Sequence, residues 1–204
     1  MAATRAVNHH ADHPGFVGIT GLLAGLTMIV GRGHVARLAA DLTSVSKGDH
    51  VVDVGCGPGT AAREAARRGA RVTGVDPALV MLGLAQLLTS RRASITWVPG
   101  VAEHLPVPDG SATVLWSIAT VHHWSDVGRG LAQARRVLTP HGRLLAIERR
   151  VRAGATGLAS HGWTDEQAAA FAAQCRAAGF TEVRFGTHHC PRQGSLLSVR
   201  ALRT

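Results

Sequence analysis

The stretch VVDVGCGPGT, Val51 to Thr60, indicates the fold more clearly than any other part of the chain. A mostly β-branched apolar run leads directly into three alternating glycines. That order is typical of a buried strand that ends in a tight loop at the start of a helix. The sequence therefore predicts a strand, a glycine loop and a helix in this part of the chain.

Short apolar runs and alanine-rich helical segments continue to alternate after this loop. Such alternation is typical of a largely parallel sheet that carries helices on its faces. We therefore expect an α/β fold, a Rossmann-like doubly wound sheet of seven strands, over residues 47–204. Strands are predicted at 51–54, 71–75, 94–98, 113–118, 143–148, 181–186 and 196–202, and helices near 60–68, 78–88, 127–138 and from Thr164 onward.

Residues 1–46 are predicted to form an N-terminal helical lid. Within them, Phe16 to Val30 is an apolar run that contains Gly18, Gly21 and Gly25. The run is shorter than the roughly 18 apolar residues that a membrane-spanning helix requires. We expect no membrane span here, but a helix that packs on the main domain or closes over a ligand.

The chain is strongly basic, with a net charge of +9 and a pI near 11.4. The basic residues are scattered arginines, with Lys47 the only lysine, and they form no run of the kind that follows a phosphate backbone. The charge therefore does not favour a nucleic-acid partner, because an arginine-rich genome composition explains it equally well. Three cysteines without metal or redox spacing predict a reducing compartment, the cytoplasm.

The acidic residues around the glycine loop indicate which ligand it holds. A dinucleotide-binding loop reads G-x-G-x-x-G, whereas Gly55, Gly57 and Gly59 give G-x-G-x-G. Asp53 precedes the loop, and a carboxylate there would repel a pyrophosphate but attract a cationic ligand. Asp76 ends the next predicted strand, where a carboxylate can accept hydrogen bonds from both hydroxyls of a ribose. The two acids favour S-adenosyl-L-methionine over NAD, because that cofactor carries an ammonium, a sulfonium and a ribose.

Four motifs in register resemble those of the class I S-adenosylmethionine-dependent methyltransferases, in particular the small-molecule branch with the ubiquinone and menaquinone C-methyltransferases. The motifs are VVDVGCGPGT, VTGVDPALVML, VAEHLPVPDGSATVLWSIATVHHW and ARRVLTPHGRLLAIE, and they lie within residues 47–150. The resemblance implies that the methionine part is held by Asp53, Gly55, Cys56, Gly57 and Gly59, the ribose by Asp76, and the adenine by Pro77, Val101, Ala102 and Glu103. It also implies that Ser117 lies beneath the methionine end.

The chain departs from the family pattern at three positions. Val101 stands where the family usually has an acid, so a hydrogen bond to the adenine amino group would be lost or supplied by a neighbour. Thr113 replaces an aspartate typical of strand four, and His141 replaces a glycine before strand five. The first change predicts a loss of about 0.5 to 1.5 kcal/mol in cofactor affinity.

Histidines gather where the acceptor of the methyl group would bind. The loop after strand four reads SIATVHHW and lacks the Asn/Asp-Pro-Pro-aromatic motif of enzymes that methylate exocyclic nitrogens. His123, with His122 beside it, is the candidate general base, because imidazole titrates near neutrality; both could also be structural. His161 and Glu148 are the next candidates. His188, His189, His9, His10 and His13 are expected at the same edge of the sheet. No metal site is predicted, because no H-E-x-x-H pair is present.

The sequence thus predicts methyl transfer from S-adenosyl-L-methionine to a small molecule, at a hydroxyl oxygen. Two alternatives remain open. One is a catalytically silent S-adenosylmethionine-binding protein, and the other is a nucleic-acid methyltransferase. No sequence feature defines the oligomeric state.

Overall fold

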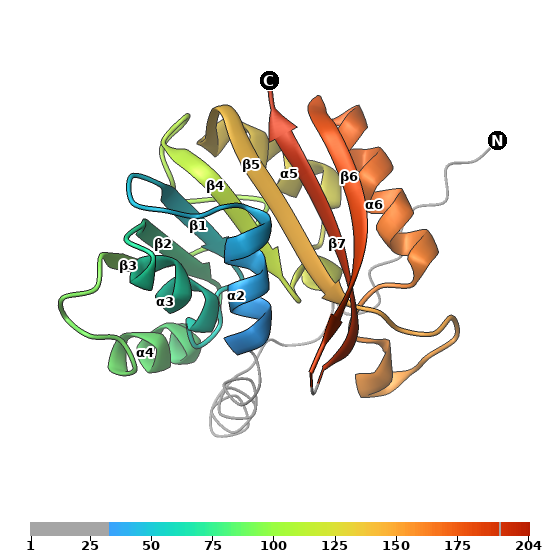
Figure 1. Ribbon diagram of the computed structural model, residues 1–204, viewed down its shortest axis with the longest axis horizontal. Coiled ribbons are helices and arrows are strands. Elements are labelled where there is room, and N and C mark those ends of the chain that lie inside the picture. Colours follow the sequence, from blue (N-terminus) through green and yellow to red (C-terminus); the bar gives the residue numbers. More distant parts are fainter. Residues whose placement is uncertain (1–32, 192) are drawn as a thin grey trace.

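The computed structural model describes residues 33–191 and 193–204. Their centre is a seven-stranded sheet of order β3-β2-β1-β4-β5-β7-β6 (Figure 1). The strands are β1 (His50–Val54), β2 (Arg71–Asp76), β3 (Ile95–Pro99), β4 (Ala112–Ile118), β5 (Leu138–Arg149), β6 (Phe180–Cys190) and β7 (Gly194–Arg203). The first five pair in parallel, and β7 runs antiparallel to both β5 and β6. The predicted seven-stranded Rossmann-like fold is therefore confirmed.

Helices cover both faces of this sheet. In Figure 1, α2 and α3 lie in front of the central strands, and α5 lies behind them. Two separate clusters of buried apolar side chains fill the layers, one beneath α2 and α3 and the other beneath α5 and α6. The helices are α2 (Gly33–Leu42), α3 (Thr60–Arg67), α4 (Leu79–Leu87), α5 (Val127–Val137) and α6 (Asp165–Ala177), with short 3-10 turns η1 (Val121–His123) and η2 (Gly157–Ser160).

Strand β1 is central, and all five of its residues are buried. Because helices cover both faces of the sheet, the valines of β1 point to both sides: Val51 belongs to one core cluster, and Val52 and Val54 belong to the other. Strand order reverses beside β1, since β2 pairs on one side of it and β4 on the other. In open sheets, ligands bind at such a point, beyond the carboxyl ends of the strands.

The start of β5 differs from the expected one. The strand begins at Leu138 instead of 143, because Leu138 pairs with Ala112 before an irregularity in the register. His141 lies in this irregular part with φ 62, a left-handed conformation that glycine adopts without strain. The glycine that the family pattern has here would therefore adopt this conformation without strain.

Thr113, the second departure from the family pattern, is part of a polar network where strands β1 and β4 begin. Its hydroxyl donates to Asp49 Oδ1 at 2.7 Å and accepts from the His50 amide. Asp49 also pairs with Arg143. A carboxylate is therefore present beside β4 although it comes from the residue before β1.

The described part of the predicted lid is helix α2. Val35, Ala36, Ala39 and Ala40 of this helix are buried, and the helix packs against α3. The apolar run from Phe16 to Val30 lies outside the described residues, as do His9, His10 and His13. Within residues 33–191 and 193–204, no helix is long and apolar enough to cross a membrane.

Candidate functional site

The glycine loop after β1 has a left-handed backbone at Gly55, Gly57 and Gly59, with φ of 70, 50 and 79. A Cβ at Gly55 would lie 2.4 Å from the Thr120 side chain, and one at Gly59 would lie 2.3 Å from the Trp97 ring. A Cβ at Gly57 would meet no atom of residues 33–191 and 193–204 within 4 Å. Two of the glycines therefore allow packing within the protein, and Gly57 alone leaves open space beside the loop.

Asp76, the last residue of β2, holds this loop by a hydrogen bond. Its Oδ2 accepts a hydrogen bond from the Gly57 amide at 2.8 Å, and its Oδ1 accepts one from the Ala78 amide at 2.9 Å. Burial raises the pKa of this carboxyl, and the two amides oppose that rise. Each carboxylate oxygen still has a second acceptor position, which is what recognition of two neighbouring hydroxyls requires.

Asp53 lies in the middle of the buried strand β1, 2% exposed. Its Oδ2 is buried and accepts no hydrogen bond from the residues that the structure describes. Burial, together with the nearby charge of Asp76, raises the pKa of Asp53 to about 7. An acid held in this way favours a cationic group beside it, because a positive charge would offset both effects.

Asp53 should make the stability of the protein depend on pH. Because its pKa is raised in the folded state from 3.8 to about 7, folding retains a proton that the unfolded chain releases above its own pKa. The free energy of unfolding should therefore fall as the pH rises from about 4 to about 7. Asp53→Asn removes this penalty, and we expect it to raise the stability at pH 8 by at least about 1 kcal/mol, roughly 2–4 °C in Tm.

Thermal unfolding of the ligand-free protein between pH 4.5 and 8.5 measures this effect. The two proteins should converge near pH 4.5 and separate above pH 7. A variant that is less stable than the wild type at pH 8 would show instead that the ionised Asp53 is stabilised in the fold. Asp53→Asn should also weaken the binding of a cationic ligand at the loop.

The turn after β4 closes the other side of the loop. Ser117, fully buried, shares a hydrogen bond of 2.6 Å with the Thr120 hydroxyl, which also donates to the Val54 carbonyl. Between them, Ala119 has a left-handed backbone with φ 58, and its amide donates to the Ile147 carbonyl. This conformation is uncommon for alanine, and it turns Thr120 back onto Gly55.

The residues expected around an adenine follow β2 and β3. Pro77 and Val101 are exposed, and Ala102 is buried. Glu103 Oε1 accepts hydrogen bonds from the Ser125 hydroxyl and the Asp126 amide, which connects this segment to the start of α5.

Cys56 belongs to the glycine loop. Its amide donates to the Val75 carbonyl, and its Sγ would lie 3.1 Å from a Cβ at Gly74. Cys56 therefore packs toward the sheet.

A cluster of three histidines, His122, His123 and His161, lies beyond β4 and β5. The ring centroids of His122 and His123 are 4.0 Å apart, and those of His161 lie 5.4 and 5.6 Å from them. Glu148, at the end of β5, is buried beneath this histidine cluster. Its Oε2 is 2.9 Å from His122 Nδ1, and its Oε1 accepts from the Val121 amide at 2.8 Å. His122 is thus the imidazole whose orientation a carboxylate fixes, while His123 is more exposed.

The loop 150–163 brings His161 to this position. The guanidinium of Arg149 donates to the carbonyls of His161 and Ala159, and the Trp163 amide donates to the Arg149 carbonyl. A Cβ at Gly162 would lie 2.1 Å from the Arg149 carbonyl oxygen. Only glycine permits so close an approach, and the loop therefore folds back onto the end of β5.

Two other histidines expected at this edge, His188 and His189, are not members of the cluster. His188 lies on β6, where its Nε2 is 2.8 Å from the Ser198 hydroxyl, and burial lowers its pKa. His189 follows it on the same strand.

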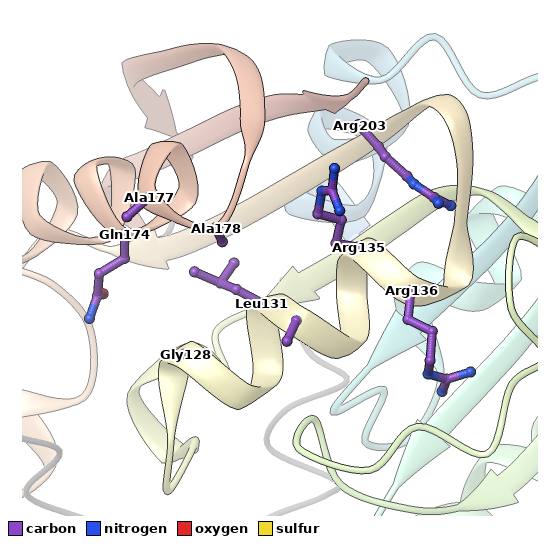
Figure 2. Close-up of a pocket in the computed structure, with 9 residues that line it drawn as sticks. Gly128, Leu131, Arg135, Arg136, Gln174, Ala177, Ala178 and Arg203 are labelled. Atoms are coloured by element: carbon purple, nitrogen blue, oxygen red, sulfur yellow. The ribbon is translucent and has the colours of Figure 1, made fainter.

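A pocket between α5 and α6 lies elsewhere in the fold (Figure 2). Leu131, Arg135, Arg136, Gln174 and Arg203 are among the residues that line it. Arg136 already donates to the carbonyls of Leu105 and Val107. None of the expected cofactor or catalytic residues lines this pocket, and we do not assign the candidate site to it.

Sequence reasoning did not identify two important features of the site. Thr120, which joins the turn after β4 to Gly55, lies within a quoted motif but was given no role. Glu148 was considered only as an alternative base, but the structure places it beneath His122 as a hydrogen-bond acceptor. Pairing between residues 26 positions apart leaves no local pattern in a sequence.

Several of the proteins that this chain resembles are methyltransferases. Residues 52–146 match a family model described as a methyltransferase domain. The demethylmenaquinone methyltransferase of Tropheryma whipplei (strain Twist) is 37% identical over 115 residues, which cover 56% of this chain and 48% of that protein. The malonyl-[acyl-carrier protein] O-methyltransferase of Pseudescherichia vulneris is 36% identical over 113 residues, covering 53% and 44%. The chain thus spans about half the length of the curated relatives it matches.

Among solved structures, a SAM dependent methyltransferase from Aquifex aeolicus is similar, with a TM-score of 0.72 and 16% identity. The match covers 89% of this chain and 98% of that protein. At this identity the likeness concerns the fold alone.

Proposed function

We propose that the protein transfers a methyl group from S-adenosyl-L-methionine to a small-molecule acceptor, because residues 52–146, where most of the quoted motifs lie, match a methyltransferase domain. One observation carries the assignment of the cofactor to this site. Two buried carboxyl groups, those of Asp53 and Asp76, adjoin an open glycine loop, and one of their oxygens has no partner among the described residues.

The residues present fit this cofactor. Asp76 has a free acceptor position on each oxygen for the ribose hydroxyls, and the unpartnered Oδ2 of Asp53 suits the cationic methionine end. The open space at Gly57 lets the ligand approach the backbone closely. When bound, S-adenosyl-L-methionine supplies an electrophilic methyl group on a positively charged sulfur.

We propose a hydroxyl oxygen as the acceptor atom, bound at the histidine cluster. A neutral hydroxyl is a weak nucleophile, so the site must help it to lose a proton. The imidazole of His122, held by Glu148, and that of His123 beside it are suited to this task. Both follow Thr120, which lies against the glycine loop. One relative named above is an O-methyltransferase, which is consistent with oxygen as the acceptor.

His123→Ala tests the role of the cluster in this reaction. If His123 takes part in activating the hydroxyl, the variant should bind S-adenosyl-L-methionine almost as well as the wild type and lose a factor of about 10² to 10⁴ in kcat. His123 is the more exposed member of the pair, so its loss should cost little stability. Calorimetry and single-turnover kinetics on the same preparation measure the two effects.

A purely structural His123 would give another pattern. The variant would then unfold at a lower temperature and lose cofactor affinity and turnover together. An unchanged kcat would remove His123 from the reaction and favour carbon, sulfur or unprotonated nitrogen as the acceptor atom.

The proposed function itself is tested in two steps. Calorimetry should detect one S-adenosyl-L-methionine per chain, and incubation with a panel of phenols, catechols and hydroxy acids should then release S-adenosylhomocysteine. Binding without turnover on any acceptor would favour a silent cofactor-binding protein. Binding to RNA or DNA that weakens steeply with salt, with methylation of that nucleic acid, would favour a nucleic-acid methyltransferase.

A further inference from the structure

We infer that the histidine cluster, His122, His123 and His161, binds a divalent transition-metal ion of the Zn²⁺ type. One nitrogen from each ring lies within 4.8 Å of the others. Three nitrogens around a tetrahedral Zn²⁺ are about 3.4 Å apart, given Zn–N distances of about 2.0–2.1 Å. Coordination therefore requires these nitrogens to approach one another by at most about 1.4 Å.

Glu148 provides the second argument for a metal. Both of its oxygens accept hydrogen bonds, one from the Val121 amide and one from His122. A carboxylate only accepts, so the hydrogen of His122 lies on Nδ1 and the lone pair on Nε2. In metal sites, a histidine ligand is oriented in this way: the ring nitrogen that does not bind the metal donates its N–H to a carboxylate.

The third ligand comes from a loop with a fixed path. Arg149 holds the carbonyl of His161, and Gly162 permits the loop to lie against the end of β5. The three ligands thus come from two segments that are each anchored to β5, one by Glu148 and the other by Arg149. Such anchoring reduces the reorganisation that metal binding would otherwise require.

Neutral imidazoles suit Zn²⁺ and the neighbouring transition metals better than Mg²⁺ or Ca²⁺, which prefer oxygen ligands. Three protein ligands leave a fourth position for water or a substrate. This extends the proposed function and rests on it: the acceptors would be molecules whose hydroxyl can bind the metal, such as phenols or enols. The O–H proton passes to water, the oxygen forms the bond to the methyl carbon, and sulfur keeps the electron pair of the broken C–S bond.

Zinc binding by the full chain tests the inference without any methyl transfer. The protein is freed of metal with a chelator and then titrated with ZnCl₂ against a chromophoric competitor. We expect one tight equivalent per chain. His161→Ala should weaken it at least about 100-fold, and Glu148→Gln by about 10- to 100-fold, the usual effect of losing a group that orients a ligand.

Two controls separate this site from other histidines. His141→Gly removes an exposed histidine near the beginning of β5, whereas the cluster lies beyond its end. Glycine adopts the conformation of this residue readily, so the variant should fold and keep its zinc affinity. Joint replacement of His9, His10 and His13 by asparagine removes the N-terminal histidines. Zinc affinity that falls only in this triple variant would overturn the inference.

The inference is also overturned if no stoichiometric zinc binds, or if His161→Ala binds zinc as the wild type does. His161 lies on a surface loop, so this variant should fold even if Glu148→Gln does not. Calorimetry with S-adenosyl-L-methionine on the same samples tests the proposed function separately. Zinc binding without cofactor binding would refute the proposed function and leave the metal site standing.

Discussion

Asp76→Ala is expected to raise the Kd for S-adenosyl-L-methionine by at least about 30-fold, or about 2 kcal/mol. The variant loses the carboxylate that we assign to both ribose hydroxyls. It also frees the amides of Gly57 and Ala78, which Asp76 holds in the wild type. Calorimetry with the cofactor and with S-adenosylhomocysteine measures the change, and both ligands should be affected equally because they share the ribose.

Asp126→Ala is the matched control for this variant. Asp126 caps α5 by accepting a hydrogen bond from the Arg129 amide, and it is exposed. Its loss should lower stability by about 1 kcal/mol and leave the cofactor affinity unchanged. Equal affinity of Asp76→Ala and the wild type would remove the ribose assignment.

Gly57→Val is expected to abolish detectable cofactor binding while the sheet remains folded. A Cβ at this position meets no atom of the described part of the chain within 4 Å, so the added side chain would extend into the space that we assign to the ligand. The left-handed backbone at φ 50 adds a strain of about 1–2 kcal/mol. Circular dichroism and thermal unfolding should therefore give a folded protein of somewhat lower Tm.

Gly59→Val provides the contrast two residues away. A Cβ there would lie 2.3 Å from the Trp97 ring, inside the fold. This variant should unfold or lose several degrees more in Tm than Gly57→Val. Normal cofactor binding by Gly57→Val would mean that VVDVGCGPGT is only a structural turn.

The sequence predicted the glycine loop and both acids because their geometry is local. Asp53 and the glycines lie within seven residues, and Asp76 ends a strand that pairs directly with β1. The regular spacing of apolar residues located all seven strands for the same reason. The early start of β5 escaped prediction because it depends on pairing with Ala112, across the sheet.

The histidine cluster could be predicted only in part. His122 and His123 follow β4 directly, and their place at the edge of the sheet follows from topology. The approach of His161 depends on Arg149 and on the close contact at Gly162, which no periodicity reveals. A local motif such as H-E-x-x-H could not reveal this cluster, since its three histidines come from two separate loops.

The contact between the glycine loop and Trp97 gives the protein an internal optical reporter. The chain has four tryptophans, of which Trp116, Trp124 and Trp163 are at most 5% exposed. Trp97 is partly exposed and packs where side chains at Gly59 and Gly74 would stand. A ligand that binds at the loop should change the polarity around this indole, so its emission wavelength should report binding in real time. Trp97→Phe would identify the signal, and stopped-flow fluorescence could then resolve how fast the ligand binds.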